Sequence, residues 1–284
     1  MDIGQRIQTI VSGFAADAAG RSVAVRVVSP FGLDASAAGD VARPAASVIK
    51  LPVIMALLRA AEAGQADLDE RVAVAGLPTS RYASVMMAFE PMSTLSLGEM
   101  AALAIITSDN PLAVHLQERV GLEAVNELLA ELGCSEAARM AAGFSEAELG
   151  PANRANRLTA EDALCIVTAI HEDPIYRPLE RAMENNLRNG RMPALLDEDV
   201  TVAHKTGSLD GVVNDAGFVS RGETAFYAAF LTEGQDDALQ TERAIAETTR
   251  AILAVLDRKT LLASAPIDDD DLPGRDDKGR LVEF

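Results

Sequence analysis

The chain has 284 residues, 49% of them apolar, which is enough to bury the core of one large domain or two interleaved ones. A formal net charge of −18 argues against partners such as nucleic acids and anionic membrane surfaces. No window holds the roughly 18 uninterrupted apolar residues of a transmembrane helix, so we expect no membrane span.

The N-terminal residues predict an amphipathic helix followed by a strand. Ile3, Ile7, Val11 and Phe14 recur at helical spacing, and no basic segment leads into a continuous apolar run as in a signal peptide. We therefore expect a cytoplasmic protein from the sequence as written, and a periplasmic or secreted one if a leader was removed. Residues 21–29 alternate polar residues with valines and predict a strand.

Helical patterns dominate the middle of the chain. Pro52 would cost the first of these helices a hydrogen bond, so we expect that helix to start late or to kink. Thr159, with Glu161 and Asp162 in the next turn, predicts a capped helix start. The expected helices cover residues 47–62, 96–107, 111–118, 122–132, 159–171 and 176–188.

The C-terminal third returns to strands and then to a helix. Residues 200–208 and 215–220 read as strands, and a turn at Arg221-Gly222 leads into another. The short turns predict antiparallel pairing, and 237–257 predicts a long amphipathic helix.

These elements predict an α+β fold, with an antiparallel sheet flanked by N- and C-terminal helices and an inserted all-helical domain. The expected sheet domain combines residues 1–44 and 192–260, and the helical domain covers 45–191. Residues 261–284 contain four consecutive aspartates and predict a mobile acidic tail.

The cysteines and most of the histidines offer no metal or redox motif. Cys134 and Cys165 have apolar, helix-like surroundings and no Cys-x-x-Cys neighbour, so we expect two buried, reduced thiols. His115 and His171 fall in helical patterns without ligand partners. His204 precedes Lys205 on a predicted strand, so its side chain should point to the opposite face of the sheet and have a packing role. We expect no metal and no cofactor.

Ser47 and Lys50 offer the first chemistry. Residues three apart share one helix face, so hydroxyl and amine can come within hydrogen-bond reach. A serine becomes a good nucleophile when a neighbouring base takes its proton, and a lysine can do so only when neutral. Burial at the positive N-terminal end of a helix favours the neutral amine. Alone, Ser-x-x-Lys also fits an ordinary surface serine and lysine.

Two further motifs favour a catalytic role for Ser47 and Lys50 over an ordinary surface serine and lysine. Ser108-Asp109-Asn110 follows a predicted helix, and Lys205-Thr206-Gly207 ends a predicted strand. A given tripeptide occurs by chance in roughly a few per cent of chains of this length, so two in this order are significant. Two of the chain's four lysines thereby fall in one candidate site.

With these motifs the chain resembles the penicillin-recognising serine hydrolases, and the motif spacing is similar to that of the class A β-lactamase branch. The resemblance runs from about residue 3 to 257 and includes the segments AGQADLDERV, SLGEMAALAIITSDN and VGLEAVNELLAELG. It implies a β-lactamase/DD-peptidase-like fold and an acyl-enzyme intermediate.

The resemblance implies a role for each motif residue. Ser47 would be the acylated nucleophile, Lys50 its proton partner and Ser108 the relay to the leaving nitrogen. Asn110 would hold the substrate's side-chain carbonyl, and Asp109 would hold the loop. Lys205 would supply positive charge, and Thr206 and Ser208 would contact the substrate carboxylate. Gly207 would belong to the same substrate-binding segment. The backbone N–H groups of Ser47 and Ser208 would form the oxyanion hole.

A glutamate in a separate loop distinguishes the class A branch from its relatives. Class A enzymes carry a Glu-x-x-Leu-Asn segment whose glutamate activates the deacylating water. Here Glu146 and Leu149 match, but Gly150 stands where asparagine is usual, and the loop is about three residues short. Glu148 is a competing candidate, and both glutamates could instead be surface carboxylates.

The leading prediction is therefore class A β-lactamase-type hydrolysis of a β-lactam amide through Ser47. One alternative is a DD-peptidase-like or esterase-like hydrolase on the same scaffold. Another is a penicillin-binding sensor that is acylated without turnover. In each case the partner is a small carboxylate-bearing amide or ester, and we expect a monomer.

Overall fold

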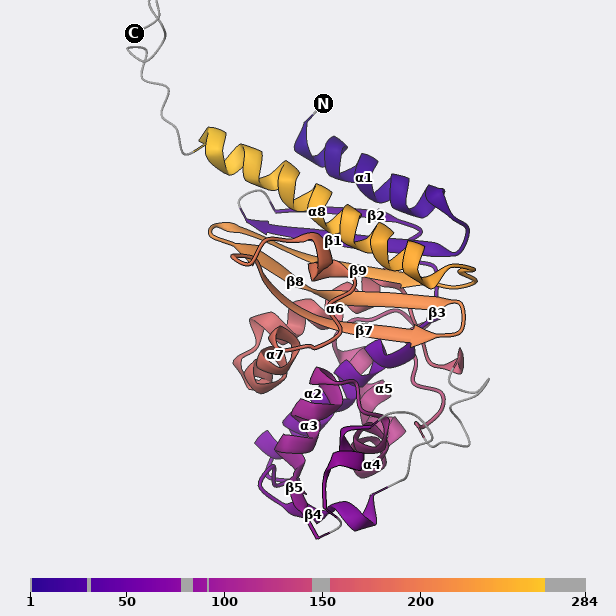
Figure 1. Ribbon diagram of the computed structural model, residues 1–284, viewed down its shortest axis with the longest axis vertical. Coiled ribbons are helices and arrows are strands. Elements are labelled where there is room, and N and C mark those ends of the chain that lie inside the picture. Colours follow the sequence, from indigo (N-terminus) through magenta and orange to yellow (C-terminus); the bar gives the residue numbers. More distant parts are fainter. Residues whose placement is uncertain (1, 30–31, 78–83, 91, 145–153, 264–284) are drawn as a thin grey trace, which may run out of the picture.

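The computed structural model describes residues 2–29, 32–77, 84–90, 92–144 and 154–263. Within them, five strands form an antiparallel sheet in the order β2-β1-β9-β8-β7 (Figure 1). The strands are β1 (Arg21–Ser29), β2 (Leu33–Ala37), β7 (Thr201–Leu209), β8 (Val212–Arg221) and β9 (Thr224–Thr232). The expected antiparallel sheet is confirmed.

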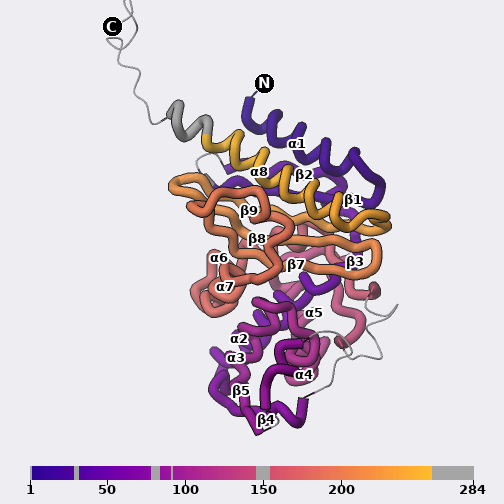
Figure 2. Tube along the Cα trace, viewed as in Figure 1, coloured from indigo at the N-terminus to yellow at the C-terminus, as the bar shows by residue number. Residues whose placement is uncertain are grey.

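Two helices from opposite ends of the chain cover one face of the sheet. They are α1 (Ile3–Asp17) and α8 (Ala238–Ala263), which pack on each other in Figure 2. Every second residue of each strand points toward these two helices, because successive side chains of a strand point to opposite faces of the sheet. Val23 and Val25 of β1, with Phe226 and Phe230 of β9, join the apolar cluster beneath these helices.

The opposite face of the sheet meets the helical part of the chain. Ala24, Tyr227 and Leu231, the alternate residues of the same strands, belong to the second and larger core cluster. The helices there are α2 (Lys50–Glu62), α3 (Leu97–Ile106), α4 (Asn110–Val120), α5 (Leu122–Glu131), α6 (Ala160–Glu172) and α7 (Arg177–Glu184). Short two-stranded pairings join β3 (Arg43–Pro44) to β6 (Arg157–Leu158) and β4 (Arg71–Ala73) to β5 (Thr94–Ser96).

Most predicted helices form where their patterns place them. Thr159 caps α6 and exchanges hydrogen bonds with Asp162 in a capping box, as its sequence predicts. α7 is shorter than predicted and ends at Glu184, and α8 continues to Ala263, beyond the predicted start of the tail at residue 261. Residues 264–284 of that tail lie outside the described residues, and the predicted domain boundaries stay predictions.

The strand β2 was not predicted. Its sequence, Leu33–Ala37, has small and acidic residues and no β-branched ones, so its local pattern does not indicate a strand. Its backbone pairs with β1 along the edge of the sheet, from Val23 opposite Ala37 to Val27 opposite Leu33. This pairing comes from tertiary structure and leaves little trace in the local pattern.

Candidate active site

Ser47 lies in a 3₁₀ turn, Ala46–Ile49, that leads directly into α2. The α-helix begins only at Lys50, so Pro52 falls in its first turn, where a missing N–H costs no helical hydrogen bond. The late start expected from Pro52 is confirmed. Ser47 therefore lies three residues before the start of a helix whose first nine residues are all buried.

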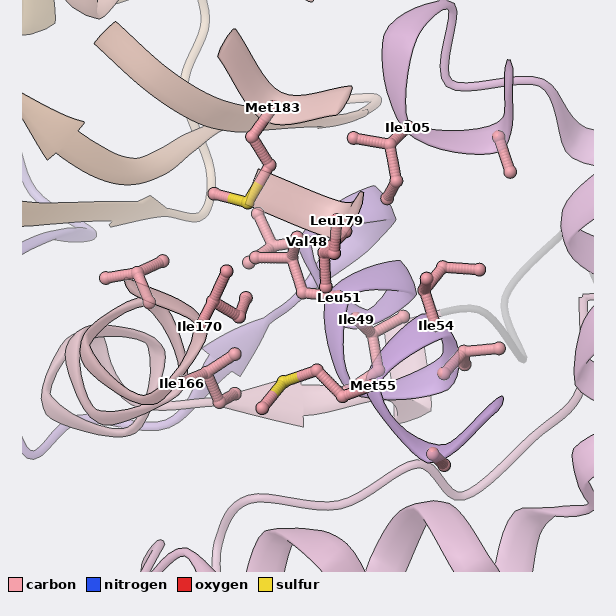
Figure 3. Packing of buried hydrophobic residues seen from close by; sticks show 14 of the residues in the cluster. Val48, Ile49, Leu51, Ile54, Met55, Ile105, Ile166, Ile170, Leu179 and Met183 are labelled. Atoms are coloured by element: carbon pink, nitrogen blue, oxygen red, sulfur yellow. The ribbon is translucent and has the colours of Figure 1, made fainter. Parts of the chain in front are cut away.

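The core around α2 fixes the position of this turn. Leu51, Leu57 and every residue between them are buried, and burying each large side chain contributes about 1.5–3 kcal/mol. Figure 3 shows the α2 side chains in one cluster with residues of three other helices: Ile105 of α3, Ile166 and Ile170 of α6, and Leu179 and Met183 of α7. A helix held from several sides gives the serine a rigid support.

Strand β7 approaches the same turn closely at Gly207. A Cβ atom on Gly207 would lie 2.9 Å from Ala45 O, 3.0 Å from Ala46 Cβ and 3.1 Å from Ser47 N. Ala46 itself has a φ of +48°, in the left-handed region. Asn214 of β8 holds the preceding backbone, since its Nδ2 donates to Pro44 O at 2.8 Å. Only glycine fits at position 207 without moving the turn.

Lys50 is fully buried, and its amine lies among four oxygens. Nζ donates to Ser108 O at 2.7 Å, Asn110 Oδ1 at 2.8 Å and Asp109 O at 3.2 Å, and lies 3.4 Å from Ser108 Oγ. Burial lowers the pKa of Lys50 to about 7, an effect that Asp109 opposes and Arg188 reinforces. Near neutral pH this lysine can therefore either accept or give up a proton.

Ser108 lies between this amine and a second one. Lys205 Nζ donates to Ser108 Oγ at 2.9 Å and to Thr206 O at 2.7 Å. Burial and the nearby positive charge of Lys50 hold the pKa of Lys205 well below its ordinary value. Ser108 has a φ of +59°, a left-handed conformation that is uncommon for serine. One hydroxyl, on a residue with an unusual backbone conformation, thus lies between two buried lysines.

Asp109 organises the loop that carries Ser108. Its Oδ1 accepts from Leu112 N at 3.2 Å and caps α4, while Oδ2 accepts from Ser84 Oγ at 2.6 Å and Val85 N at 2.9 Å. These contacts agree with the expectation that this aspartate holds the loop.

The structure thus brings six of the predicted site residues to one place: Lys50, Ser108, Asn110, Lys205, Thr206 and Gly207. Ser47 is half-buried at the start of the same helix. Among the described residues, no hydrogen bond joins its hydroxyl to Lys50. Glu146, Glu148 and Gly150 lie outside the described residues.

Arg191 was not predicted as a site residue, and its guanidinium is buried against the same strand. Nη2 donates to Ser208 Oγ at 2.6 Å, and Nη1 donates to Gly207 O at 2.9 Å and to Asn214 O. Nε pairs with Glu242 of α8 at 3.1 Å. Arg191 therefore fixes Ser208, the last residue of the predicted binding strand. No motif surrounds Arg191, because its partners are two backbone carbonyls and two side chains from distant parts of the sequence.

The histidines serve other contacts. His204 is buried and its Nδ1 lies 2.9 Å from Asp215 Oδ1, while Nε2 lies 3.1 Å from Asn189 Oδ1, consistent with the expected packing role. His171 stacks on Phe218. In the part of the chain that the structure describes, no three metal-binding side chains come together, and no helix is long and apolar enough to cross a membrane.

A family model described as the β-lactamase enzyme family matches residues 2–256. The chain belongs to this family. The resemblance stated from the three motifs is thereby confirmed, and with it a fold of the serine β-lactamase type. No curated protein matches the chain.

Solved structures of β-lactamases share this fold. The β-lactamase from Sphaerobacter thermophilus DSM 20745 is 28% identical, with a TM-score of 0.77, over 89% of this chain and 97% of that one. A representative class A β-lactamase from Bacteroides cellulosilyticus DSM 14838 is 25% identical, with a TM-score of 0.78, over 91% and 99%. The structure of PBP-A, at 24% identity and a TM-score of 0.76 over 90% and 96%, is similar in fold.

Proposed function

We propose that this member of the β-lactamase family hydrolyses a β-lactam amide through an acyl-enzyme on Ser47. The observation that carries the proposal is the position of Ser108 Oγ, 2.9 Å from the amine of Lys205 and 3.4 Å from that of Lys50. Two buried lysines around one hydroxyl, beside a half-buried serine at a helix start, are suited to moving protons during acyl transfer.

Acylation then follows from these groups. Neutral Lys50 takes the proton of Ser47 as Oγ bonds to the lactam carbonyl carbon. The developing oxyanion is stabilised by the backbone N–H groups of Ser47 and Ser208, each such donor being typically worth about 2.7–4 kcal/mol. The carbon–nitrogen bond of the lactam breaks, and the proton passes from Lys50 through Ser108 to the leaving nitrogen. Water then hydrolyses the ester, with Glu146 as its proposed base.

Substrate recognition rests on the strand that follows Lys205. We infer that Lys205 with the hydroxyls of Thr206 and Ser208 binds the substrate carboxylate, while Asn110 holds a side-chain carbonyl. Asn110 Oδ1 already accepts from Lys50, which leaves its amide N–H₂ group to donate to that carbonyl.

Gly150 favours a second candidate, a hydrolase or sensor that is acylated but deacylates differently. Glycine at that position lacks the amide that helps hold the hydrolytic water in class A enzymes. A chromogenic cephalosporin separates the candidates. Steady turnover supports the β-lactamase, and a stoichiometric burst supports the sensor or a DD-peptidase-like hydrolase. No reaction supports the esterase-like hydrolase, for which a thioester substrate is the next assay.

Replacing Lys205 should weaken anionic substrates selectively. A charge-assisted hydrogen bond is worth about 1.5–3 kcal/mol, so Lys205→Ala should reduce kcat/KM for a carboxylate-bearing substrate by about 10- to 100-fold more than for its neutral methyl ester. Both substrates meet the same Ser47, so the ester serves as the internal control. Equal losses for the two would leave Lys205 as a partner of Ser108 alone.

The rate of acylation should depend on pH through Lys50. Its pKa is lowered to about 7 by burial, so the neutral amine that can act as the base becomes the main form as pH rises through about 7. We expect the rate of acylation by a neutral ester to rise across this range and then level. Stopped-flow measurement with an uncharged ester keeps substrate ionisation out of the profile. A rate that is flat from about pH 6 to pH 8 would contradict Lys50 as the base.

A further inference from the structure

Cys134 and Cys165 lie where the turn after α5 meets α6. Cys134 comes just after the end of α5, and Cys165 lies within α6. Each sulfur lies against the backbone of the other segment: Cys165 Sγ donates to Leu132 O at 3.0 Å, and Cys134 Sγ lies 4.0 Å from Asp162 O. Each thiol also shifts the pKa of the other, as expected for two neighbouring groups. Two cysteines 31 positions apart in sequence thus form one pair.

Hydrogen bonds hold the two segments in this arrangement. Ser135, next to Cys134, donates from its backbone to Asp162 Oδ1 at 2.7 Å and from its hydroxyl to Asp162 Oδ2 at 2.9 Å. Cys134 N donates to Leu129 O at 3.0 Å. Both thiols are half-buried, where buried ones were expected from the sequence. Because both cysteines are partly exposed, a small molecule can reach the two thiols. The hydrogen bonds of Ser135 already hold the two backbone segments together.

The environment makes the two thiols unequal. The hydrogen bond from Cys134 lowers the pKa of Cys165 to about 7, and the positive charge of Arg26 on β1 adds to the effect. The same contact and burial raise the pKa of Cys134. Cys165 is therefore the thiol that ionises more readily near neutral pH, and on ionising it gives up its hydrogen bond to Leu132 O. The thiolate is the reactive form, and Cys134 keeps its proton.

We propose that Cys134 and Cys165 are a peroxide-sensitive dithiol that closes to an intramolecular disulfide. The Cys165 thiolate attacks one oxygen of hydrogen peroxide, the O–O bond breaks, and the products are a sulfenic acid and water after proton uptake. Cys134 then attacks the sulfenic sulfur; the S–S bond forms, the S–O bond breaks, and the hydroxide leaves as water with the Cys134 proton. Two thiols are oxidised while one peroxide is reduced to two waters.

The disulfide would tie the turn after α5 to α6 and enclose residues 135–164 in a covalent loop. That loop includes Glu146, the proposed deacylating base. None of the described contacts of either thiol involves Lys50, Ser108 or Lys205. The dithiol is therefore a second site, and its test does not depend on the hydrolase proposal.

The test treats dilute, fully reduced protein with hydrogen peroxide and follows the intact mass under non-reducing conditions. We expect a loss of about 2 Da, loss of both maleimide-reactive thiols, and full reversal by dithiothreitol. Peptide mapping should then find Cys134 joined to Cys165. A gain of about 16, 32 or 48 Da on monomeric protein with no cross-link, or a disulfide-linked dimer, would overturn the proposal.

Two matched variants test the assigned roles. Cys134→Ser should stop at a Cys165 sulfenic acid, trapped by dimedone, whereas Cys165→Ser should react far more slowly with peroxide. The opposite order of reactivity would overturn the assignment of Cys165 as the attacking thiol. Where a variant does not fold, competitive alkylation of wild-type protein by iodoacetamide at pH 7 gives the same answer, since Cys165 should be labelled first.

Discussion

Ser47→Ala is expected to abolish the covalent adduct that a penicillin or an activated ester forms with this protein. Without the hydroxyl no acyl bond can form, whatever the surrounding groups do. Lys50→Met, which keeps the side-chain volume and removes the amine, should lose nearly as much activity as Ser47→Ala. The double variant should lose no more, because groups that act as a unit do not contribute additively.

The adduct is best mapped by mass spectrometry of proteolytic peptides, with Ser12→Ala as the matched control. Ser12 is exposed on α1, so its replacement should leave adduct formation unchanged. An adduct that persists in Ser47→Ala would exclude Ser47 as the acyl acceptor. Circular dichroism should accompany Lys50→Met, since that substitution leaves Ser108 O and Asn110 Oδ1 without their buried donor.

Glu146→Ala is expected to separate deacylation from acylation. If the Glu146 carboxylate activates the hydrolytic water, its removal slows deacylation by about 10²- to 10⁴-fold, the usual contribution of general-base catalysis. The Ser47 acyl-enzyme should then accumulate long enough to be seen by intact-mass spectrometry. The burst of acylation should change much less, because Lys50 serves that step.

Two neighbouring substitutions control for the register of this loop. Glu148→Ala should turn over almost normally, while Gly150→Asn should speed deacylation by restoring an amide beside the water. A trapped adduct in Glu148→Ala with normal turnover in Glu146→Ala would shift the assignment by two residues. If neither glutamate matters, deacylation proceeds by a route unlike that of class A enzymes.

Local chemistry made much of the fold predictable. Thr159 predicts its capped helix because the hydroxyl and Asp162 satisfy backbone donors within one turn. The valines of β1 predict a strand because alternate side chains enter two apolar layers. The strand β2 could not be predicted in this way, since backbone pairing with β1 and not its own side chains defines it.

The residues of the candidate site also fall into those that local sequence predicts and those that only the folded structure reveals. Ser47, Lys50, Ser108 and Lys205 could be found because their chemistry occurs in short, ordered motifs. Arg191 could not, because its partners are carbonyls and side chains that only the folded sheet brings together. The proximity of the two cysteines escaped prediction for the same reason: it needs the turn after α5 to lie against α6.

The sheet order also constrains the sequence of events during synthesis on the ribosome. β2 can pair with β1 as soon as both have emerged, but the other edge of β1 pairs with β9, where Val25 lies opposite Ala228. That partner is translated about 200 residues later, after every helix from α2 to α7. The helical middle can therefore condense while the first strands wait with one edge open, and the nascent chain completes its sheet only when its last third has been made.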